Sequence, residues 1–344
     1  MPAKKTAAWR GIREELLRVF EERRGEYLSG EAIGQRLGVS RAAVWKAVEA
    51  LRREGYRFSA ATRRGYALDN TSDILTEEGI RAHLSQDSPV SRVICLETVD
   101  STNNYAKRLA LTRVENGTLV AANQQTAGKG RRGHSFMSPP GTGLYMSLVL
   151  RPTAAMERFQ MITVAAAVAV CLTLEELTQE KPLIKWVNDI YLRRRETGEE
   201  LKICGILSEA VSDVETGSIE SVVVGLGLNV TTRNFGELKG IAGSLFPKGV
   251  GRNQIAAGIA EHLMDLAGRL DDPKLIQEYR DRSLLLGREI TYAQDEPAGS
   301  PQKETAHRAL AVDIDAQGGL VVENKKGERV TLRSGEVFEV QSVR

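Results

Sequence analysis

Apolar side chains recur at helical spacing near the start of the chain and at strand-like spacing soon afterwards. Ser29 and Ser40 stand where N-cap residues of two of the helices are needed. The expected elements are helices over 9–24, 31–37 and 41–54, followed by β-type runs over 56–59 and 65–68. Three helices followed by a hairpin predict a winged helix-turn-helix.

After a polar stretch at 69–73 the pattern becomes one of strands that alternate irregularly with helices. This is typical of an α/β or α+β domain with a substantial sheet. Strands are expected over 93–97, 119–123, 143–150, 183–187, 203–211 and 221–229, and helices near 76–83, 101–111, 158–178, 252–270 and 273–284. Beyond residue 287 the strands expected are 289–292, 308–314, 320–323, 329–332 and 336–341, with an exposed hairpin loop at 295–304. This last set predicts a small final β-barrel.

Composition places the chain among soluble globular proteins. It has 344 residues, 42% hydrophobic and 27% charged, which predicts two or three domains. The longest apolar stretch, 161–172, is shorter than the ~20 residues of a membrane span, and no secretory core follows the basic start. The three cysteines show no metal-ligand spacing and are expected to be reduced core residues. We therefore expect a cytoplasmic protein that does not contact a membrane.

Charge is distributed unevenly along the chain. The first 70 residues hold 15 Lys and Arg against 9 Asp and Glu, a net +6, and the remaining residues carry −4. A basic winged helix indicates DNA binding, although such modules also dock proteins. Groove contacts are expected from the start of the third helix, and contacts to the DNA backbone from the wing. The candidate DNA-binding residues are Arg41, Ala42, Trp45 and Lys46 on the helix and Arg63 and Arg64 on the wing.

Residues 124–133, QQTAGKGRRG, have the most unusual composition in the chain. They contain GxGxxG, but a dinucleotide site needs a helix that begins at the glycines, and the HSFMSPPG that follows cannot start one. What remains is a loop with three cations among three glycines, whose backbone N–H groups can approach phosphate oxygens closely. We expect this loop to close over an anionic nucleotide, and a solvated basic turn is the alternative.

Three further segments point to the same kind of ligand. The run DSTNN, 100–104, follows a strand and opens a helix, so hydroxyls, an amide and a helix N-terminus converge there; plain helix capping is the alternative. Lys185 in KWVND lies in an apolar strand, where a cation needs an anionic partner, either a ligand or a structural salt bridge. GLGLN, 225–229, ends a hydrophobic strand and indicates close approach of a ligand, or else a β-bulge.

Together these four segments resemble one family, the biotin–protein ligases, and specifically the bifunctional kind that also represses the biotin operon. The matching motifs are the Ser-Thr-Asn helix start, GKGRRG for GRGRRG, SPPGTGLYMSLVLRP, KWVND for KWPND, KICGIL and GLGLN. The predicted winged helix and final barrel extend the resemblance over nearly the whole chain. The departures are mild: Lys129 replaces an arginine, Val187 a proline, and Phe136 stands where some members have tryptophan.

The resemblance implies an ATP-dependent ligase that forms biotinyl-5′-AMP with Mg²⁺ and transfers biotin to a lysine of the biotin carboxyl carrier protein of acetyl-CoA carboxylase. It also implies that the adenylate promotes a homodimer, which binds operator DNA. On this resemblance the catalytic residues are Arg131 and Lys185, and no residue is assigned as a metal ligand. The implied biotin-binding residues are Ser101, Thr102, Asn103, Gln125, Lys129, Gly130, Arg131 and Lys185, and the nucleotide-binding residues are Arg131, Arg132, Phe136, Asn188 and Asn229.

The expected architecture is multidomain α+β. It comprises a winged helix-turn-helix domain over 1–70, a class II synthetase-like α/β catalytic domain over 71–285 and an SH3-like β-barrel over 286–344. Two other functions stay open. A biotin-sensing regulator without ligase activity would show no ATP–pyrophosphate exchange, and in a lipoate or octanoate ligase free biotin would not compete.

Overall fold

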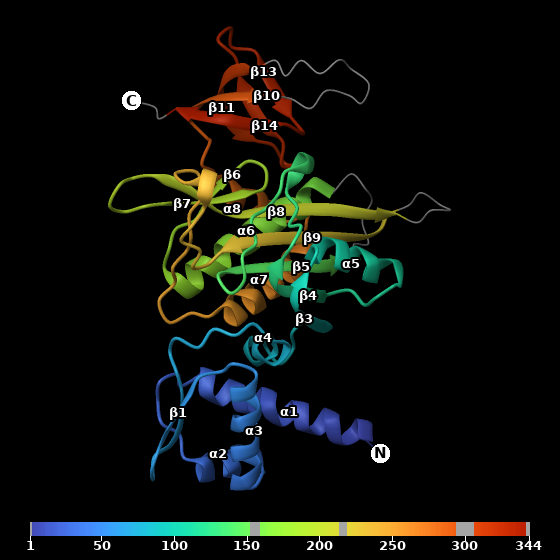
Figure 1. The fold of residues 1–344 in the computed structure, drawn as a ribbon. Coiled ribbons are helices and arrows are strands. Elements are labelled where there is room, and N and C mark those ends of the chain that lie inside the picture. The colour runs from blue at the N-terminus through green and yellow to red at the C-terminus, as the bar shows by residue number, and fades with distance from the viewer. Residues whose placement is uncertain (1, 152–158, 213–218, 294–305, 342–344) are drawn as a thin grey trace.

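Three modules lie in a row along one axis, with the ends of the chain on the two outer modules (Figure 1). The structure is a computed structural model that describes residues 2–151, 159–212, 219–293 and 306–341. A helical module with a hairpin is followed by a large central sheet covered by helices, and a small sheet forms the opposite end (Figure 1).

The first module contains the winged helix-turn-helix that the sequence predicts. Its elements are α1 (Pro2–Glu21), α2 (Gly30–Leu37), α3 (Arg41–Arg53) and the antiparallel pair β1 (Phe58–Ala61) and β2 (Gly65–Leu68). The Ser29 and Ser40 hydroxyls accept hydrogen bonds from the backbone N–H groups of Glu31 and Ala43, as predicted for N-caps. The apolar faces of the three helices meet in a core of their own that contains Leu16, Leu17, Phe20, Val44, Val48 and Leu51.

Helix α4 (Glu77–His83) and the segment before it join the first module to the second. The Arg252 side chain, 2% exposed, pairs with the Asp73 carboxylate at 3.0 Å and also donates to the Asn123 side chain and the Gly143 carbonyl. Asn253 donates to the Ile74 carbonyl at 2.7 Å. These contacts attach the segment that follows the winged helix to the central module and so set the orientation of the winged helix relative to the central sheet.

The central sheet has seven strands in the order β3-β4-β5-β9-β8-β7-β6, and only the β3–β4 pair is parallel. The strands are β3 (Arg92–Val99), β4 (Thr118–Gln125), β5 (Gly143–Leu150), β6 (Leu183–Lys185), β7 (Asp189–Arg193), β8 (Glu200–Ser212) and β9 (Ile219–Asn229). Helix α5 (Thr102–Leu111) packs on one face, whereas α6 (Phe159–Thr178), α7 (Arg252–Ala267) and α8 (Pro273–Asp281) belong to the larger core on the other.

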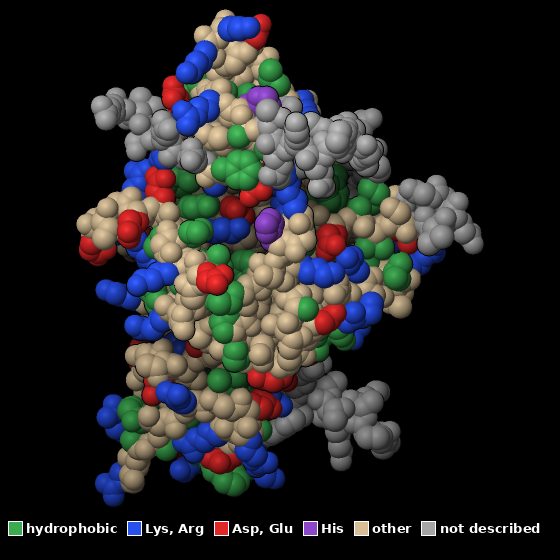
Figure 2. All heavy atoms as spheres, turned by 45° about the horizontal axis from the view of Figure 1, so that its top comes forward, with side chains coloured by type: hydrophobic (Ala, Val, Ile, Leu, Met, Phe, Trp, Pro, Cys, Tyr) green, Lys and Arg blue, Asp and Glu red, His purple; other side chains and the backbone are tan. Residues whose placement is uncertain are grey.

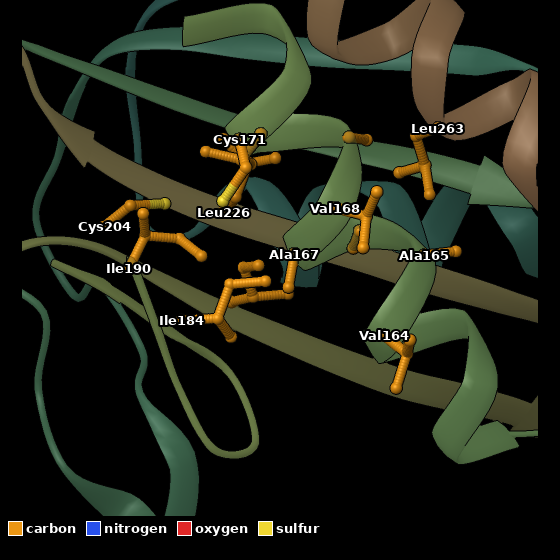
Figure 3. Packing of buried hydrophobic residues seen from close by; sticks show 14 of the residues in the cluster. Val164, Ala165, Ala167, Val168, Cys171, Ile184, Ile190, Cys204, Leu226 and Leu263 are labelled. Atoms are coloured by element: carbon orange, nitrogen blue, oxygen red, sulfur yellow. The ribbon is translucent and has the colours of Figure 1, made fainter. Parts of the chain in front are cut away.

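Helix α6 confirms the helix predicted over 158–178 and includes the apolar stretch 161–172. Its 20 residues are apolar enough to cross a membrane by length and composition alone, but 72% of the apolar window is buried inside the protein. Figure 3 shows its Ala167, Val168 and Cys171 among side chains from the sheet and from α7. The helix is thus the core helix of this domain. The three cysteines are free, as predicted, and burial raises the pKa of Cys171 and of Cys204.

The last module is a five-stranded antiparallel sheet in the order β13-β12-β11-β10-β14. Its strands are β10 (Glu289–Ala293), β11 (His307–Ile314), β12 (Leu320–Glu323), β13 (Arg329–Leu332) and β14 (Glu336–Gln341). Gln160 and the Trp186 indole both donate to the Gly318 carbonyl, at 2.8 and 2.9 Å, and so attach this sheet to the central module. The hairpin loop predicted at 295–304 lies outside the described residues.

Two segments differ from the prediction. Strand β7 was not expected, because Trp186–Asn188 turns the chain back inside the run 183–187 that the sequence indicated as one strand. Helix α1 begins at Pro2 rather than near residue 9, since the alanines and lysines before Trp9 are strong helix formers.

Candidate functional site

One cavity of ≈ 320 Å³ opens where the Gly-rich loop meets the central sheet. The N-terminus of α5, segment 185–189, strands β8 and β9, and residues 335–337 of the last sheet line it together. All four segments that the sequence singled out are therefore in one place. The candidate ligand residues that line the cavity are Ser101, Thr102, Asn103, Gln125, Lys129, Gly130, Arg131, Arg132, Phe136, Lys185, Asn188 and Asn229.

The N-terminus of α5 forms a polar, water-shielded end of the cavity. Ser101 is the N-cap residue, but its hydroxyl makes no capping hydrogen bond, so plain helix capping does not account for it. The Gln125 carbonyl accepts a hydrogen bond from the Thr102 backbone N–H at 2.8 Å, and its amide donates to the Ser138 hydroxyl at 2.9 Å. Ser101 and Thr102 are 2% and 3% exposed, so their hydroxyls are shielded from bulk water, and the Thr102 hydroxyl also donates to the Gln125 carbonyl at 3.1 Å.

The Gly-rich loop is a folded turn over the cavity. The Gly130 N–H donates to the His134 carbonyl at 2.7 Å, and the Phe136 N–H donates to the Gly128 carbonyl at 2.9 Å. The three cations of the loop are fastened to three different parts of the protein. Lys129 donates to Asn104 at 2.8 Å, Arg131 to Asn188 at 3.2 Å and Arg132 to Glu336 at 3.0 Å. These contacts argue against a merely solvated turn and hold positive charge at the rim of the cavity.

Lys185 lies at the end of β6, where the sequence predicted a cation in need of an anion. Burial lowers the pKa of Lys185 below its usual value, although the nearby Asp189 carboxylate opposes that shift. The ammonium lies 5.7 Å from the centroid of the Tyr191 ring. Among the described residues no carboxylate lies within salt-bridge distance of it, although Asp189 and Glu336 are close enough to act on its charge. A partly buried cation of this kind is suited to an anionic ligand.

Two glycines of β9 make room for side chains that shape the cavity. A Cβ atom on Gly225 would lie 1.8 Å from Asn103 Oδ1, and one on Gly227 would lie 2.4 Å from the Phe136 ring. The register of β9 against β5 runs without interruption from Val222 to Asn229, so these glycines do not mark a β-bulge. They let α5 and the Phe136 ring approach the strand closely.

The structure adds two charged residues that the sequence analysis missed. Lys202 Nζ lies 2.7 Å from Asp189 Oδ1, and both residues line the cavity beside Lys185. Both residues belong to motifs quoted above: Asp189 is the last residue of KWVND, and Lys202 is the first residue of KICGIL. Their pairing depends on the register of β7 against β8, which no sequence pattern gave.

Side chains with oxygen atoms that could contact a metal ion line the cavity. Among the described residues no group of three or more His, Cys, Asp and Glu side chains could hold a metal ion. The Asp189 carboxylate and the side chains of Asn188 and Asn229 supply oxygens at one end of the cavity. Mg²⁺ bound together with phosphates needs only one or two such protein ligands.

The candidate DNA-binding residues lie together on the surface of the first module. Arg41, Ala42, Trp45 and Lys46 of α3 are exposed, as are Arg63 and Arg64 at the tip of the wing. Figure 2 shows Lys and Arg side chains gathered at this end of the molecule. Arg64 lies 4.4 Å from the centroid of the Tyr27 ring, which supports the wing tip. The helix and the wing thus present one basic surface.

Comparison with known proteins identifies the class. Residues 95–229 match the biotin/lipoate A/B protein ligase family, residues 12–67 a helix-turn-helix domain, and residues 300–338 the biotin protein ligase C-terminal domain. The fold is similar to that of a biotin protein ligase from Aquifex aeolicus solved in complex with biotin and ATP. That structure has 25% sequence identity and a TM-score of 0.59, and the match covers 72% of this chain and 99% of the other. The central and last modules therefore have the architecture of a biotin protein ligase.

Two curated relatives narrow the assignment. The chain is 37% identical to the bifunctional ligase/repressor BirA of Bacillus subtilis over 74% of this chain and 76% of the relative. It is 30% identical to the protein of the same name from Salmonella typhimurium, over 91% of this chain and 95% of the relative. The chain belongs to the family of bifunctional biotin ligases and repressors.

Proposed function

We propose that this protein is an ATP-dependent biotin–protein ligase that also represses transcription through its winged helix. One observation carries the ligase proposal. Lys185, Arg131 and Lys202 line the same cavity as the shielded polar N-terminus of α5. A site that combines neutral polar groups with cations suits a ligand that has a hydrogen-bonding head group and a carboxylate tail.

The biotin head group belongs, in this proposal, at the α5 end of the cavity. Ser101, Thr102 and Gln125 supply hydroxyl and amide groups for its ureido ring, and Asn103 forms the wall behind them. Gly130 and Lys129 cover the head group from the loop. The valeryl tail then extends along β9, past Gly225 and Gly227, toward Lys185, so that the carboxylate meets the buried ammonium.

The nucleotide occupies the other end. Arg131 and Arg132 approach its phosphates from the loop, the Phe136 ring forms an apolar wall, and Asn188 and Asn229 provide amides. Asp189, Asn188 and Asn229 are the residues that would hold Mg²⁺ with the phosphates, where the ion neutralises charge on the departing pyrophosphate. These oxygens fit such an ion, since carboxylate and amide oxygens are its usual protein ligands.

In the first half-reaction the biotin carboxylate attacks the α-phosphorus of ATP, an O–P bond forms, and pyrophosphate leaves. Both reactants are anions, so the cations Lys185 and Arg131 must offset their repulsion and stabilise the charge that builds up in the transition state. Asn188 accepts from Arg131 at 3.2 Å and donates to the Ile206 carbonyl at 2.8 Å, so the guanidinium is oriented before ligand arrives. Preorganisation of this kind avoids reorganisation during the reaction.

In the second half-reaction a neutral lysine amine of the carrier protein attacks the acyl carbon, the C–O bond to AMP breaks, and the amine loses a proton. The two substrates are positioned together, so no covalent enzyme residue is needed. The mixed anhydride is sensitive to water, and the Gly-rich loop shields it because its turn lies over the cavity. The proposed acceptor is the biotin carboxyl carrier protein of acetyl-CoA carboxylase.

The regulatory part of the proposal links occupancy of this site to DNA binding by the winged helix. Bound biotinyl-5′-AMP promotes a homodimer, and two winged helices then bind two operator half-sites.

We propose domain boundaries at 1–70, 71–285 and 286–344. We also propose a class II synthetase-like fold for the catalytic domain, an SH3-like barrel for the last module and a cytoplasmic location. The three separately matched segments and the antiparallel order of the last sheet support these boundaries.

Two assays test the catalytic proposal. The purified protein is expected to exchange labelled pyrophosphate into ATP only when biotin is present, and to attach biotin to a carrier domain. A biotin-binding regulator without ligase activity gives no exchange. A lipoate or octanoate ligase gives exchange that depends on those acids and is not inhibited by free biotin.

A further inference from the structure

The segment that follows β9 leaves the central sheet and returns to the same place, so that residues 230–246 form a closed loop. The Leu245 N–H donates to the Asn229 carbonyl at 3.0 Å, and the Phe246 N–H donates to the Val230 carbonyl at 2.8 Å. The two ends of the loop thus lie together beside Asn229, which the proposed function assigns to the nucleotide. None of the proposed catalytic steps uses this loop.

The side of this loop that borders the cavity is apolar. The side chains of Phe235, Leu238 and Ile241 line the cavity, and Leu238 and Ile241 are 43% and 57% exposed. Burial of such apolar surface by a ligand is favourable, provided that the surface already has the right shape when the ligand arrives. The contribution of the loop to nucleotide binding therefore depends on how firmly the loop is held.

One side chain from outside the loop holds its returning end. Arg194 lies directly after β7, and its guanidinium donates to the Ser244 carbonyl at 2.6 Å. Ser244 is fully buried, and a buried carbonyl that lacks a hydrogen-bond partner is costly. The Ser244 hydroxyl in turn donates to the Thr232 carbonyl at 2.7 Å, near the start of the loop. Arg194 is thus bonded to the residue that links the two ends of the loop.

The last residue of the loop has an unfavourable backbone conformation. Phe246 has a φ of +52°, in the left-handed region that side-chain-bearing residues rarely adopt. Such a conformation persists only where the surrounding structure holds it. The Arg194 guanidinium lies 5.9 Å from the centroid of the Phe246 ring, and the Arg233 guanidinium lies 5.4 Å from it, both within the range of cation–π attraction. Arg194 therefore holds the end of the loop at two points, a carbonyl and a ring.

We propose that Arg194 is a positioning residue for nucleotide binding, which holds the loop 230–246 so that Leu238 and Ile241 face the nucleotide. The inference rests on the proposed placement of ATP beside Asn229. Arg194 is not among the residues that line the cavity, so it acts on the nucleotide through the loop and not by contact. The biotin head group is proposed to bind at the N-terminus of α5, and binding of biotin alone should not depend on Arg194.

The loop keeps other attachments when Arg194 is replaced. The Lys202 N–H donates to the Ile241 carbonyl and the Gly243 N–H donates to the Lys202 carbonyl, each at 2.9 Å. These backbone hydrogen bonds to β8 do not involve the guanidinium. We therefore expect a loop that remains folded but is less precisely placed, so that nucleotide binding weakens while the reacting groups stay in position.

The test measures biotin-dependent pyrophosphate exchange and the calorimetric affinity for biotin in the full-length protein. In Arg194→Met we expect the KM for ATP to rise about tenfold, because a charge-assisted hydrogen bond and a ring contact are lost. The exchange rate at saturating ATP and the affinity for biotin alone should stay within about twofold of wild type. Arg194→Lys keeps a cation and a donor, so its KM for ATP should rise only about threefold.

Arg195→Met is the matched control, since Arg195 is the next residue along the chain and is exposed. This variant removes the same charge from the same hairpin and should leave the KM for ATP within about twofold of wild type. A double-variant cycle with Phe246→Leu tests the contact between the guanidinium and the ring. If Arg194 and Phe246 hold the same end of the loop, the combined rise in the KM for ATP should be smaller than the product of the two single effects.

An unchanged KM for ATP in Arg194→Met, or an equal rise in Arg195→Met, overturns the inference and leaves the ligase proposal intact. A loss of biotin affinity as large as the rise in KM also overturns it, since loss of structure would explain both effects, and so does a double variant in which the single effects multiply. If Arg194→Met does not fold, Arg194→Lys and Arg195→Met decide by the same comparison. Absence of exchange in wild type overturns the ligase proposal together with the inference.

Discussion

Replacing Gly227 by alanine tests whether the Phe136 ring forms the nucleotide wall. The added Cβ would lie 2.4 Å from one ring carbon of Phe136 and 2.7 Å from another. Ordinary contacts begin near 3.4 Å, so the ring must retreat by about 1 Å. Its retreat is limited, because the Phe136 backbone N–H bonds to Gly128 and the ring meets Tyr145 edge-on with centroids 6.4 Å apart.

The Gly227→Ala substitution costs binding free energy for ATP, because it forces the Phe136 ring away from its preferred position. Overpacking of one methyl group costs about 1–3 kcal/mol, and 1.4 kcal/mol corresponds to a factor of ten in an equilibrium constant. We expect the KM for ATP in pyrophosphate exchange to rise about tenfold or more. The affinity for biotin alone should change by less than about twofold, since Phe136 is proposed to contact only the nucleotide.

Gly205→Ala is the matched control. Gly205 pairs directly with Gly227 across β8 and β9, but its added Cβ would lie 3.4–3.5 Å from Lys202 and Phe136, which is an ordinary contact. Exchange kinetics of this variant should resemble those of wild type. An unchanged KM for ATP in Gly227→Ala, or an equal effect in both variants, would refute the assignment of Phe136 to the nucleotide.

Four other perturbations test separate parts of the structure. Arg131→Gly is expected to release biotinyl-5′-AMP and to label bystander proteins in a mixture, and wild-type acceptor selectivity would contradict the role of this guanidinium. Because burial lowers the pKa of Lys185, binding of an anionic ligand should raise it again, so that Lys185 takes up a proton at alkaline pH; calorimetry at a series of alkaline pH values in buffers of different ionisation enthalpy detects that uptake, and Lys185→Met should abolish it. Arg252→Met removes a buried guanidinium and its hydrogen bonds to Asp73, Asn123 and the Gly143 carbonyl, and should lower the free energy of unfolding by about 1–3 kcal/mol in urea denaturation. Arg269→Met at the surface should change it by less than about 0.5 kcal/mol. Lys46→Met should weaken DNA binding of all sequences alike and reduce the slope of log K against log salt by about 1, as measured by anisotropy at several salt concentrations.

The local elements of this fold could be predicted because each depends on neighbouring residues. Ser29 and Ser40 cap their helices as expected, and glycine or polar residues end most strands within a few positions of the predicted limits. Helix α6, Phe159–Thr178, agrees with the helix predicted over 158–178, because its buried face continues beyond the apolar stretch through residues such as Leu174.

The sequence indicated which segments line the cavity, but it did not indicate which side chains pair with one another there. The motif segments all line one cavity, since each combines glycines, hydroxyls or cations in a manner that an isolated strand or turn does not need. The pairing of Lys202 with Asp189 and the contact of Arg132 with Glu336 depend on strand register and on the approach of the last sheet.

One measurement tests the central claim most directly, namely that a single ligand site serves both a ligase and a repressor. DNA from upstream of the organism's own biotin genes is titrated with the protein, with and without biotin and MgATP, and biotinylation of a carrier domain is followed in the same tubes. We expect the carrier to be labelled and DNA binding to strengthen only when biotin and MgATP are both present. If the carrier is labelled but DNA binding is the same with and without biotin and MgATP, the coupling between ligand binding and DNA binding is contradicted. If neither activity is seen, the assignment of the cavity as the biotin and ATP site is contradicted.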